Sequence, residues 1–277
     1  MSDQSNINLP FMKMHGLGND FVVLDARYRD ISLSNSLVRN IADRHRGVGF
    51  DQLAVIRNGA EDAFLEFYNA DGSVSSACGN ATRCIARYLM SQTGQSDVSL
   101  TTDHGTLAAR DMGGMLTSVN MGFPGVDWQD IPLSDPIDTL SLPIEGDPVA
   151  TNMGNPHCTF FVEDAEAVDL KHRGALIEHH PLFPERTNVQ FAALLGENHL
   201  RMRVWERGVG ITLASGSSSC AALVAAARRG LTGKSARIEL DGGALQVEWR
   251  DDGVWLTGPT MHVFSGNFTT DYLESAR

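Results

Sequence analysis

The chain has 277 residues, of which 42% are hydrophobic and 20% are charged, and its formal net charge is −12. This length is typical of about two domains, and the composition is that of an ordinary globular protein. The acidic charge argues against a nucleic-acid-binding or membrane-binding surface, because both need clustered Lys and Arg side chains. It leaves small zwitterionic or neutral ligands open as partners.

The N-terminus and the cysteines indicate the compartment. The first ten residues have neither the basic region nor the apolar region of a secretory signal, and no apolar run approaches the ~18 to 20 residues that cross a bilayer. The four cysteines form no C-x-x-C pair and are too sparse for a disulfide framework, so we expect a cytoplasmic protein. Cys84, Cys158 and Cys220 fall in apolar patterns and are expected in the core.

The first half of the chain predicts a strand, a polar loop and a helix in succession. Residues 64–68, F-L-E-F-Y, alternate in the manner of a half-buried strand. Cys78 and Gly79 follow a polar loop, and apolar residues then recur at helical spacing up to Gly94. Cys78 is therefore expected at or just before the N-terminus of a helix. Residues 97–110 are typical of two β-segments around a turn.

A proline-rich stretch separates this half from a second one with the same succession. The stretch covers about residues 127–147 and is the best candidate for a domain boundary. Beyond it, residues 200–205 alternate like a strand, and Ser215 precedes a second helical pattern that ends at Gly230. Residues 236–249 again predict strands with turn glycines.

The two halves also match residue by residue at a nearly constant offset. Rare polar residue types meet at an offset of 136 or 137, and one residue of drift corresponds to a single loop insertion. A chance match would instead pair common residues such as Leu and Ala. The matched pairs are Asn19 with Asn155, Gln52 with Asn188, Tyr68 with Trp205, Asn69 with Glu206, Ala77 with Ala214, Cys78 with Ser215, and Gly79 with Gly216.

The repeat predicts an α+β fold with two pseudo-symmetric domains, each a β-sheet or barrel wrapped around a central α-helix. The predicted domains cover residues 9–130 and 146–263. Residues 264–277 either follow the second domain or return to the first. The two predicted helices are rich in alanine, which favours close wrapping by strands because small side chains let backbones approach.

A nucleophile at a helix N-terminus has a defined chemistry. Unpaired N–H groups and the helix dipole favour the thiolate of Cys78, and the same groups can hold a carboxylate. Two such ends facing each other would place Cys78 and Ser215 on opposite sides of an α-carbon. That arrangement removes a proton from one face and returns it to the other, and it needs no cofactor.

Motifs for cofactors and metals are missing. Residues 16–21 and 47–52 lack the third glycine of a dinucleotide-binding motif, and Lys234 lacks the earlier glycine of a P-loop. His172, His179 and His180 have no spaced carboxylate or cysteine partners, so we expect a solvated loop and no metal site.

Five motifs in matching order, between about Phe11 and Phe268, resemble the diaminopimelate epimerase family. Each motif alone would be weak, whereas the five together are highly specific. They are M-H-G-L-G-N-D-F (14–21), Y-N-A-D-G-S (68–73) leading to A-C-G-N (77–80), G-N-P-H (154–157), T-N-V (187–189), and E-R-G-V-G (206–210) leading to A-S-G-S (214–217).

The resemblance implies a cofactor-independent, two-base epimerase that interconverts LL- and meso-2,6-diaminopimelate, commonly as a homodimer. It implies that Cys78 and Ser215 hold the two acid–base positions, with His157 and Glu206 beside the reacting centre. The backbone N–H groups of Gly79, Asn80, Gly216 and Ser217 would hold the reacting carboxylate. The other substrate-binding residues would be Asn19, Gln52, Asn69, Asn155, Asn188, Glu206 and Arg207.

Position 215 departs from the family motif, which has a second cysteine there. A serine hydroxyl is a far weaker acid than a thiol, so it does not readily become the base, although it can donate a proton or order a water. Three interpretations stay open: a change introduced to trap substrate, a natural enzyme of reduced or one-directional activity, and a related racemase or dehydratase with Cys78 as its single base. A catalytically weak paralogue that binds an amino acid is a further alternative.

Overall fold

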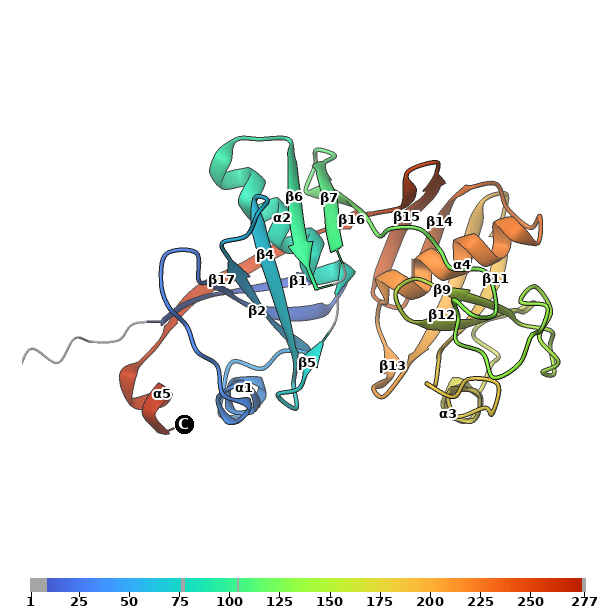
Figure 1. Cartoon of the computed structure of the whole chain (residues 1–277), viewed down its shortest axis with the longest axis horizontal. Helices are drawn as coiled ribbons and strands as arrows, with labels where there is room; N and C mark the ends of the chain where they lie inside the picture. The colour runs from blue at the N-terminus through green and yellow to red at the C-terminus, as the bar shows by residue number, and fades with distance from the viewer. Residues whose placement is uncertain (1–8, 76–77, 104, 276–277) are drawn as a thin grey trace, which may run out of the picture. The chain divides into compact units, whose positions relative to one another are not determined.

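The computed structural model describes residues 9–75, 78–103 and 105–275, which form two compact units. The first unit consists of the residues up to Thr117 together with those from Thr260 onward, and the second consists of Ser118–Pro259. In Figure 1 the first unit runs from blue to green and resumes in red, and the second runs from green to orange. None of the helices in these ranges combines the length and the apolar character that crossing a bilayer requires.

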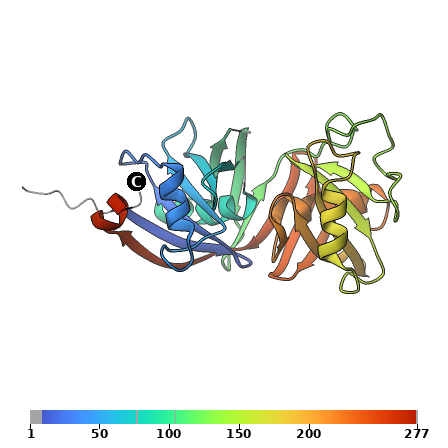
Figure 2. The ribbon, with the colours of Figure 1, turned by 90° about the horizontal axis from the view of Figure 1, so that it is seen from below.

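The first unit is built on one run of hydrogen-bonded strands, in the order β17, β1, β2, β3, β4, β6, β7, with β5 also on β4. The β2–β3 and β4–β6 pairs are parallel and the others antiparallel. β17 lies alongside β1 in Figures 1 and 2, although the two are at opposite ends of the chain. The elements are β1 (Leu9–Gly16), β2 (Asn19–Asp25), α1 (Asn35–Ala42), β3 (Gln52–Arg57), β4 (Ala63–Asn69), β5 (Val74–Ser75), α2 (Gly79–Thr93), β6 (Asp97–Thr102), β7 (Gly105–Asp111), β8 (Leu116–Asn120, which enters the second unit), β17 (Met261–Phe268) and α5 (Thr270–Ser275).

The second unit has the strand order β9, β10, β11, β12, β14, β15, β16, with β13 also on β12. Here β10–β11 and β12–β14 are the parallel pairs. The elements are β9 (Val149–Asn152), β10 (Pro156–Phe161), α3 (Leu170–Glu178), β11 (Asn188–Gly196), β12 (His199–Glu206), β13 (Gly210–Thr212), α4 (Gly216–Arg228), β14 (Ser235–Leu240), β15 (Gly243–Arg250) and β16 (Gly253–Pro259).

The internal repeat is confirmed by this topology. From β1 to β7 and from β9 to β15, the two units have the same succession of antiparallel and parallel pairs, and α1 and α3 occupy the same place in that succession. The registers agree too, since Phe21 pairs with Gln52 on β2–β3 and His157 pairs with Asn188 on β10–β11. The α+β fold with two similar domains, each a sheet around a central helix, follows from this agreement.

The central helices are α2 and α4, as the sequence predicts. α2 ends at Thr93, and its C-cap residue, Gly94, has a φ of 73°, a left-handed conformation that suits glycine. α4 ends at Arg228, and Gly230 follows its C-cap with a φ of 70°. Four alanines of α4 are fully buried, and the helix contacts strands β9, β10, β11, β14, β15 and β16. Cys84, Cys158 and Cys220 are fully buried, which confirms their expected place in the core.

The proline-rich stretch at residues 127–147 lies inside the second unit. Ile131, Leu133 and Leu142 pack into that unit's hydrophobic core. Two arginines at the C-terminal end of α4 hydrogen-bond to this segment. Arg228 donates to the hydroxyl of Thr139, and Arg229 donates to the carbonyl of Leu140. The compact units therefore divide at 117/118 and 259/260, whereas the sequence placed the boundary between residues 130 and 146. Prolines break strands, and here they occur in an irregular segment whose apolar residues still contribute to a core.

Candidate active site

Cys78 is the N-cap residue of α2. Its backbone is extended, with φ −149° and ψ 101°, and its Sγ accepts from the N–H of Ala81 at 3.4 Å. The next N–H groups, of Gly79 and Asn80, belong to the first turn, which has no intrahelical acceptors. The thiol therefore lies half-buried at the positive end of the helix, as expected from the sequence. Ala77, which the repeat pairs with Ala214, lies outside the described residues.

Two asparagines lie beside this thiol. Asn19, the first residue of β2, places its Oδ1 atom 3.9 Å from Sγ of Cys78. The same oxygen accepts from Nδ2 of Asn80 at 3.0 Å. Asn19 is half-buried and Asn80 is buried, so the pair presents one carbonyl oxygen next to the thiol.

Gln52 and Asn69 form a second polar pair in the first unit. They are register partners on β3 and β4, and Nε2 of Gln52 donates to Oδ1 of Asn69 at 3.3 Å and to Ser75 at 3.0 Å. Nδ2 of Asn69 donates to Ser73 at 3.0 Å. With these donors engaged, Gln52 retains its carbonyl oxygen as an acceptor for a ligand.

Ser215 is the N-cap residue of α4, at the position equivalent to Cys78. Its φ and ψ are −134° and 119°, but its side chain makes no capping hydrogen bond. Instead its hydroxyl donates to Oε2 of Glu206 at 3.1 Å, and the hydroxyl of Thr212 donates to Oε1 at 2.5 Å. Ser215 is 3% exposed and Glu206 is half-buried, so the hydroxyl is shielded from water and the carboxylate only in part. Gly216 and Ser217 follow it in the first turn of α4.

Buried His157 and half-buried Asn155 form a pair in the second unit. Nε2 of His157 lies 2.7 Å from Oδ1 of Asn155, and Nδ1 lies 3.4 Å from the hydroxyl of Ser218. Because an amide oxygen only accepts, Nε2 carries the proton and Nδ1 accepts from Ser218. Burial disfavours the charged imidazole and lowers the pKa of His157 to about 3. The neutral ring therefore orients the amide of Asn155.

The turn after β12 is held by two internal side chains. Buried Asn188 accepts from the backbone N–H of Arg207 and donates to the carbonyl of Pro156, both at 3.0 Å. Glu178 of α3, 3% exposed, accepts from Nε1 of Trp205 at 2.7 Å and from the N–H of Gly208 at 2.9 Å. The guanidinium of Arg207 donates to the carbonyl of Glu185 at 3.0 Å, which leaves several of its N–H groups for a ligand.

The predicted residues thus fall into two groups, one in each unit. The sequence did not single out Ser218, Glu178 or Asp51, each of which contacts a predicted residue or its loop. Asp51 directly precedes Gln52, and Ser218 lies in the S-S-S run, but neither position carries a motif. The group in the first unit comprises Cys78, Gly79, Asn80, Asn19, Gln52 and Asn69, and the group in the second comprises Ser215, Gly216, Ser217, Glu206, Asn155, His157, Asn188 and Arg207.

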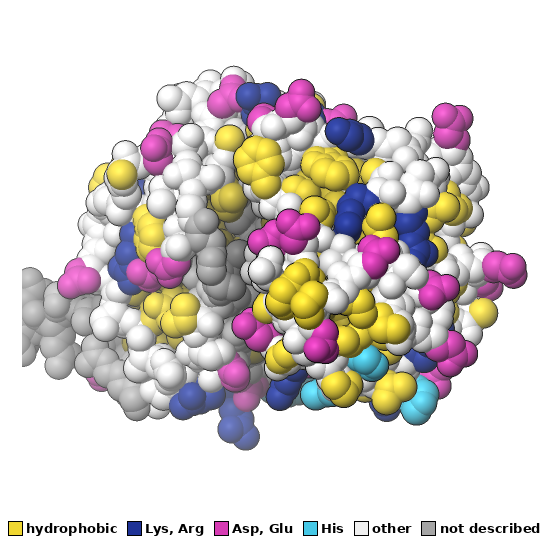
Figure 3. All heavy atoms as spheres, turned by 45° about the vertical axis from the view of Figure 1, so that its right-hand side comes forward, with side chains coloured by type: hydrophobic (Ala, Val, Ile, Leu, Met, Phe, Trp, Pro, Cys, Tyr) yellow, Lys and Arg dark blue, Asp and Glu magenta, His cyan; other side chains and the backbone are white. Residues whose placement is uncertain are grey.

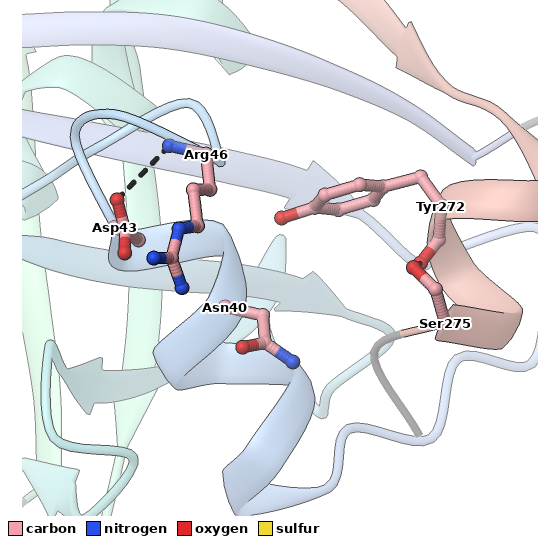
Figure 4. A pocket seen from close by; sticks show the side chains of 5 residues that line it. All are labelled: Asn40, Asp43, Arg46, Tyr272 and Ser275. Atoms are coloured by element: carbon pink, nitrogen blue, oxygen red, sulfur yellow. Dashed lines mark hydrogen bonds between the residues drawn. The ribbon is translucent and has the colours of Figure 1, made fainter.

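A pocket of about 300 Å³ lies elsewhere in the first unit (Figure 4). It is lined by α1, the turn after it and α5, with Asn40, Asp43, Arg46, Tyr272 and Ser275 around it. None of the predicted site residues lines it.

Over the described ranges, no group of three or more His, Cys, Asp or Glu side chains is suited to hold a metal ion. Acidic side chains are scattered over the face in Figure 3, in keeping with the negative net charge.

The buried His157 predicts a specific pH dependence of stability. Its pKa is about 3 in the folded chain and near 6.5 when unfolded, so the stability contributed by the neutral ring is complete above pH 6.5 and is lost as the pH falls toward 3. Between pH 6.5 and 5.5 the wild type is expected to lose about 1 kcal/mol more unfolding free energy than His157→Gln. Urea unfolding at each pH measures this, and parallel pH profiles for the two proteins would contradict it.

Comparison with known proteins gives two kinds of match. A model of the diaminopimelate epimerase family matches residues 11–124 and 149–263. The chain is 51% identical over 274 residues to a diaminopimelate epimerase of Rhodospirillum centenum, covering 96% of this chain and 94% of that protein. It is 52% identical over 264 residues to one of Acidiphilium cryptum, covering 93% and 95%.

Solved structures share the fold at low sequence identity. A predicted epimerase from Pseudomonas aeruginosa matches with a TM-score of 0.69 and 15% identity, covering 94% of this chain and 99% of that one. A hydroxyproline epimerase from Agrobacterium vitis matches with a TM-score of 0.66 and 15% identity, covering 98% and 94%. At this identity the likeness concerns the fold alone.

Proposed function

Because the chain belongs to the diaminopimelate epimerase family, we propose that it is an isomerase that interconverts LL- and meso-2,6-diaminopimelate without a cofactor. The observation that carries this proposal is the equivalent placement of Cys78 and Ser215. Each is the N-cap of the central helix of its unit, and each lies beside an oxygen acceptor, of Asn19 and Glu206 respectively.

The reaction needs one proton acceptor and one proton donor on opposite faces of the α-carbon. We assign the first role to the thiolate of Cys78 and the second to the hydroxyl of Ser215, which receives a proton from the carboxyl group of Glu206 as it gives its own proton to the α-carbon. In the reverse direction the same transfers run backwards: the thiol of Cys78 gives its proton to the α-carbon, and the carboxylate of Glu206 accepts the hydroxyl proton as Ser215 takes the α-proton. Proton exchange with water then returns Cys78 and Glu206 to their starting states. The N–H groups of Gly79, Asn80, Gly216 and Ser217 would hold the carboxylate whose charge grows as the α-proton leaves.

The remaining side chains suit a substrate with ammonium and carboxylate groups. Asn19 and Gln52 present carbonyl oxygens, which accept from an ammonium. Asn155, with its oxygen engaged by His157, presents N–H groups, and Arg207 adds a planar fork for a carboxylate. We propose that Asn69, Asn188 and Glu206 complete the binding set by contact with the substrate or by holding these groups.

The test is exchange of the α-proton in D2O. Purified protein is incubated with LL-diaminopimelate, and NMR follows both exchange and formation of the meso isomer. Exchange together with inversion is the expected result. Exchange without inversion would contradict the two-base assignment and favour the alternative in which Cys78 is a single base, as in a racemase or dehydratase of the same superfamily. If the wild type shows neither exchange nor inversion, and Ser215→Cys shows neither as well, the diaminopimelate assignment is wrong.

We further propose that the protein is a homodimer in the cytoplasm. All four cysteines are free thiols, which suits a reducing compartment. Met261, Val263 and Phe264 of β17 are 39%, 54% and 48% exposed, and exposed apolar side chains gathered on one strand are typical of a subunit contact. Sedimentation equilibrium measures the dimer, and a monomer at micromolar concentration would contradict it. Recovery of the protein outside the cytoplasmic fraction would contradict the compartment.

A further inference from the structure

The amide of Asn19 is oriented with its oxygen toward Cys78 and its nitrogen toward Asp51, and the neighbouring residues explain this orientation. Its Nδ2 atom donates to Oδ2 of Asp51 at 2.9 Å, and its Oδ1 atom faces Nδ2 of Asn80 at 3.0 Å and Sγ of Cys78 at 3.9 Å. An asparagine amide can rotate by half a turn and exchange its donor for its acceptor. Which end faces the thiol therefore depends on what holds the other end.

Asn80 does not determine the orientation of the Asn19 amide. If both amides rotated, Asn19 and Asn80 would still share one hydrogen bond, with the direction reversed. In the observed arrangement Oδ1 of Asn80 is buried and has no hydrogen-bond partner among the described residues. A buried amide end without a partner costs free energy in either arrangement, so Asn80 does not decide between them. Another group must impose the observed one.

Asp51 is that group, because an ionised carboxylate only accepts hydrogen bonds. Its carboxylate accepts from Arg44 at 2.9 Å and from the backbone N–H of Asp20 at 3.2 Å, in addition to Asn19. Its own N–H donates to the carboxylate of Asp20 at 3.0 Å. If Asn19 rotated, its oxygen would face the carboxylate oxygen of Asp51, and two acceptors would be in contact.

Asp20, which contacts Asp51 through two backbone hydrogen bonds, stays ionised over the ordinary pH range. Burial acts to raise the pKa of Asp20, but hydrogen bonds from Arg44 and Lys13 outweigh it and hold the pKa at about 2. Arg44 makes two bonds to Asp20, at 2.8 and 3.0 Å, and Lys13 makes one at 2.6 Å. Asp51 is thus anchored by charged and backbone partners.

We propose that Asp51 is a positioning residue, which fixes the amide of Asn19 so that its carbonyl oxygen faces Cys78 and the substrate's ammonium group. The part that concerns the substrate rests on the proposed function, whereas the part that concerns Cys78 does not. Without Asp51 the amide is free to turn its N–H toward the sulfur. That N–H would stabilise the thiolate, whereas the carbonyl oxygen accepts from the thiol.

The experiment compares two variants that both remove the charge of Asp51. Asp51→Ala removes the acceptor, whereas Asp51→Asn keeps an oxygen that can accept from Asn19. Iodoacetamide alkylation of Cys78 in the full chain, followed by mass spectrometry across pH 6 to 10, gives the midpoint of thiolate formation. We expect the midpoint to fall by about one pH unit in Asp51→Ala and by much less in Asp51→Asn. Equal shifts would overturn the proposal in favour of a charge effect, and no shift in either would overturn it outright.

Two further measurements keep the test independent of folding and of the proposed function. In an Asn19→Ala background, Asp51→Ala is expected to leave the midpoint unchanged, because the two residues act through one contact. An added shift there would contradict the proposal.

In kinetics, Asp51→Ala is expected to raise KM for diaminopimelate about tenfold more than Asp51→Asn. An alkylation shift in a protein whose wild type lacks epimerase activity would reject the proposed function and retain the role of Asp51.

Discussion

Ser215→Cys is expected to epimerise diaminopimelate about 100-fold faster than the wild type, since a well-placed acid–base group contributes factors of this size. The residue lies at the N-terminus of α4, and its hydroxyl already donates to Glu206 at 3.1 Å. A thiol in this place would lose its proton far more easily than the hydroxyl does, because a thiol is the stronger acid and the helix dipole favours its thiolate. The NMR assay in D2O measures the rate of inversion.

The matched control for this variant is Ser219→Cys. Ser219 lies one turn further along α4, is buried, and donates to the backbone carbonyl of Ser215 at 2.8 Å. The Ser219→Cys change introduces a sulfur atom into the same helix, at a buried position away from the helix N-terminus. We expect no gain from it. If Ser215→Cys were folded and no faster than the wild type, position 215 would not be an acid–base position.

Cys78→Ala is expected to reduce both α-proton exchange and inversion about 1,000-fold, because it removes the group assigned as base. The expected loss concerns kcat with little change in KM, since the alanine leaves the helix N–H groups in place to hold the carboxylate. Single-time-point NMR is too insensitive for such a loss, so long incubations with a no-enzyme blank are needed.

Cys84→Ala is the matched control for Cys78→Ala. Both cysteines belong to the same stretch, but Cys84 is fully buried in α2, and burial raises the pKa of its thiol to about 12. It carries no thiolate at neutral pH, so the variant is expected to retain activity. Equal losses in the two variants would mean that helix packing, and not the chemistry of Cys78, accounts for the effect.

The repeat and the helix ends could be predicted because they depend on local residue types. Gly94 ends α2 because glycine adopts a left-handed backbone easily, and the residues at the N-terminal ends of α2 and α4 stand out as polar among alanines. The place of residues 127–147 could not be predicted in the same way. Their prolines are typical of a linker, and only the burial of Ile131, Leu133 and Leu142 shows that they belong to a core.

The polarity of the site side chains was also beyond prediction. The sequence selects Asn19 and Asn155, but not which end of each amide is available to a ligand. Asn19 is oriented by Asp51, which is 32 residues away, and the ring beside Asn155 by Ser218, which is 61 residues from His157. Contacts of this range depend on strand register, and no local pattern specifies them. The sequence likewise did not predict that Glu206 would accept from Ser215.

The pairing of β17 with β1 sets the order in which the chain can complete its units during synthesis. Leu9 pairs with Phe268, and Phe11 stacks on Phe268 with ring centroids 4.5 Å apart. All strands of the second unit lie between these partners in sequence, so that unit can close while β17 is still unmade. The first unit, although it begins first, exposes the edge of β1 until the last strand leaves the ribosome, and an unpaired edge is where aggregation starts. We therefore expect the edge of β1 to need protection while the residues between β1 and β17 are being made.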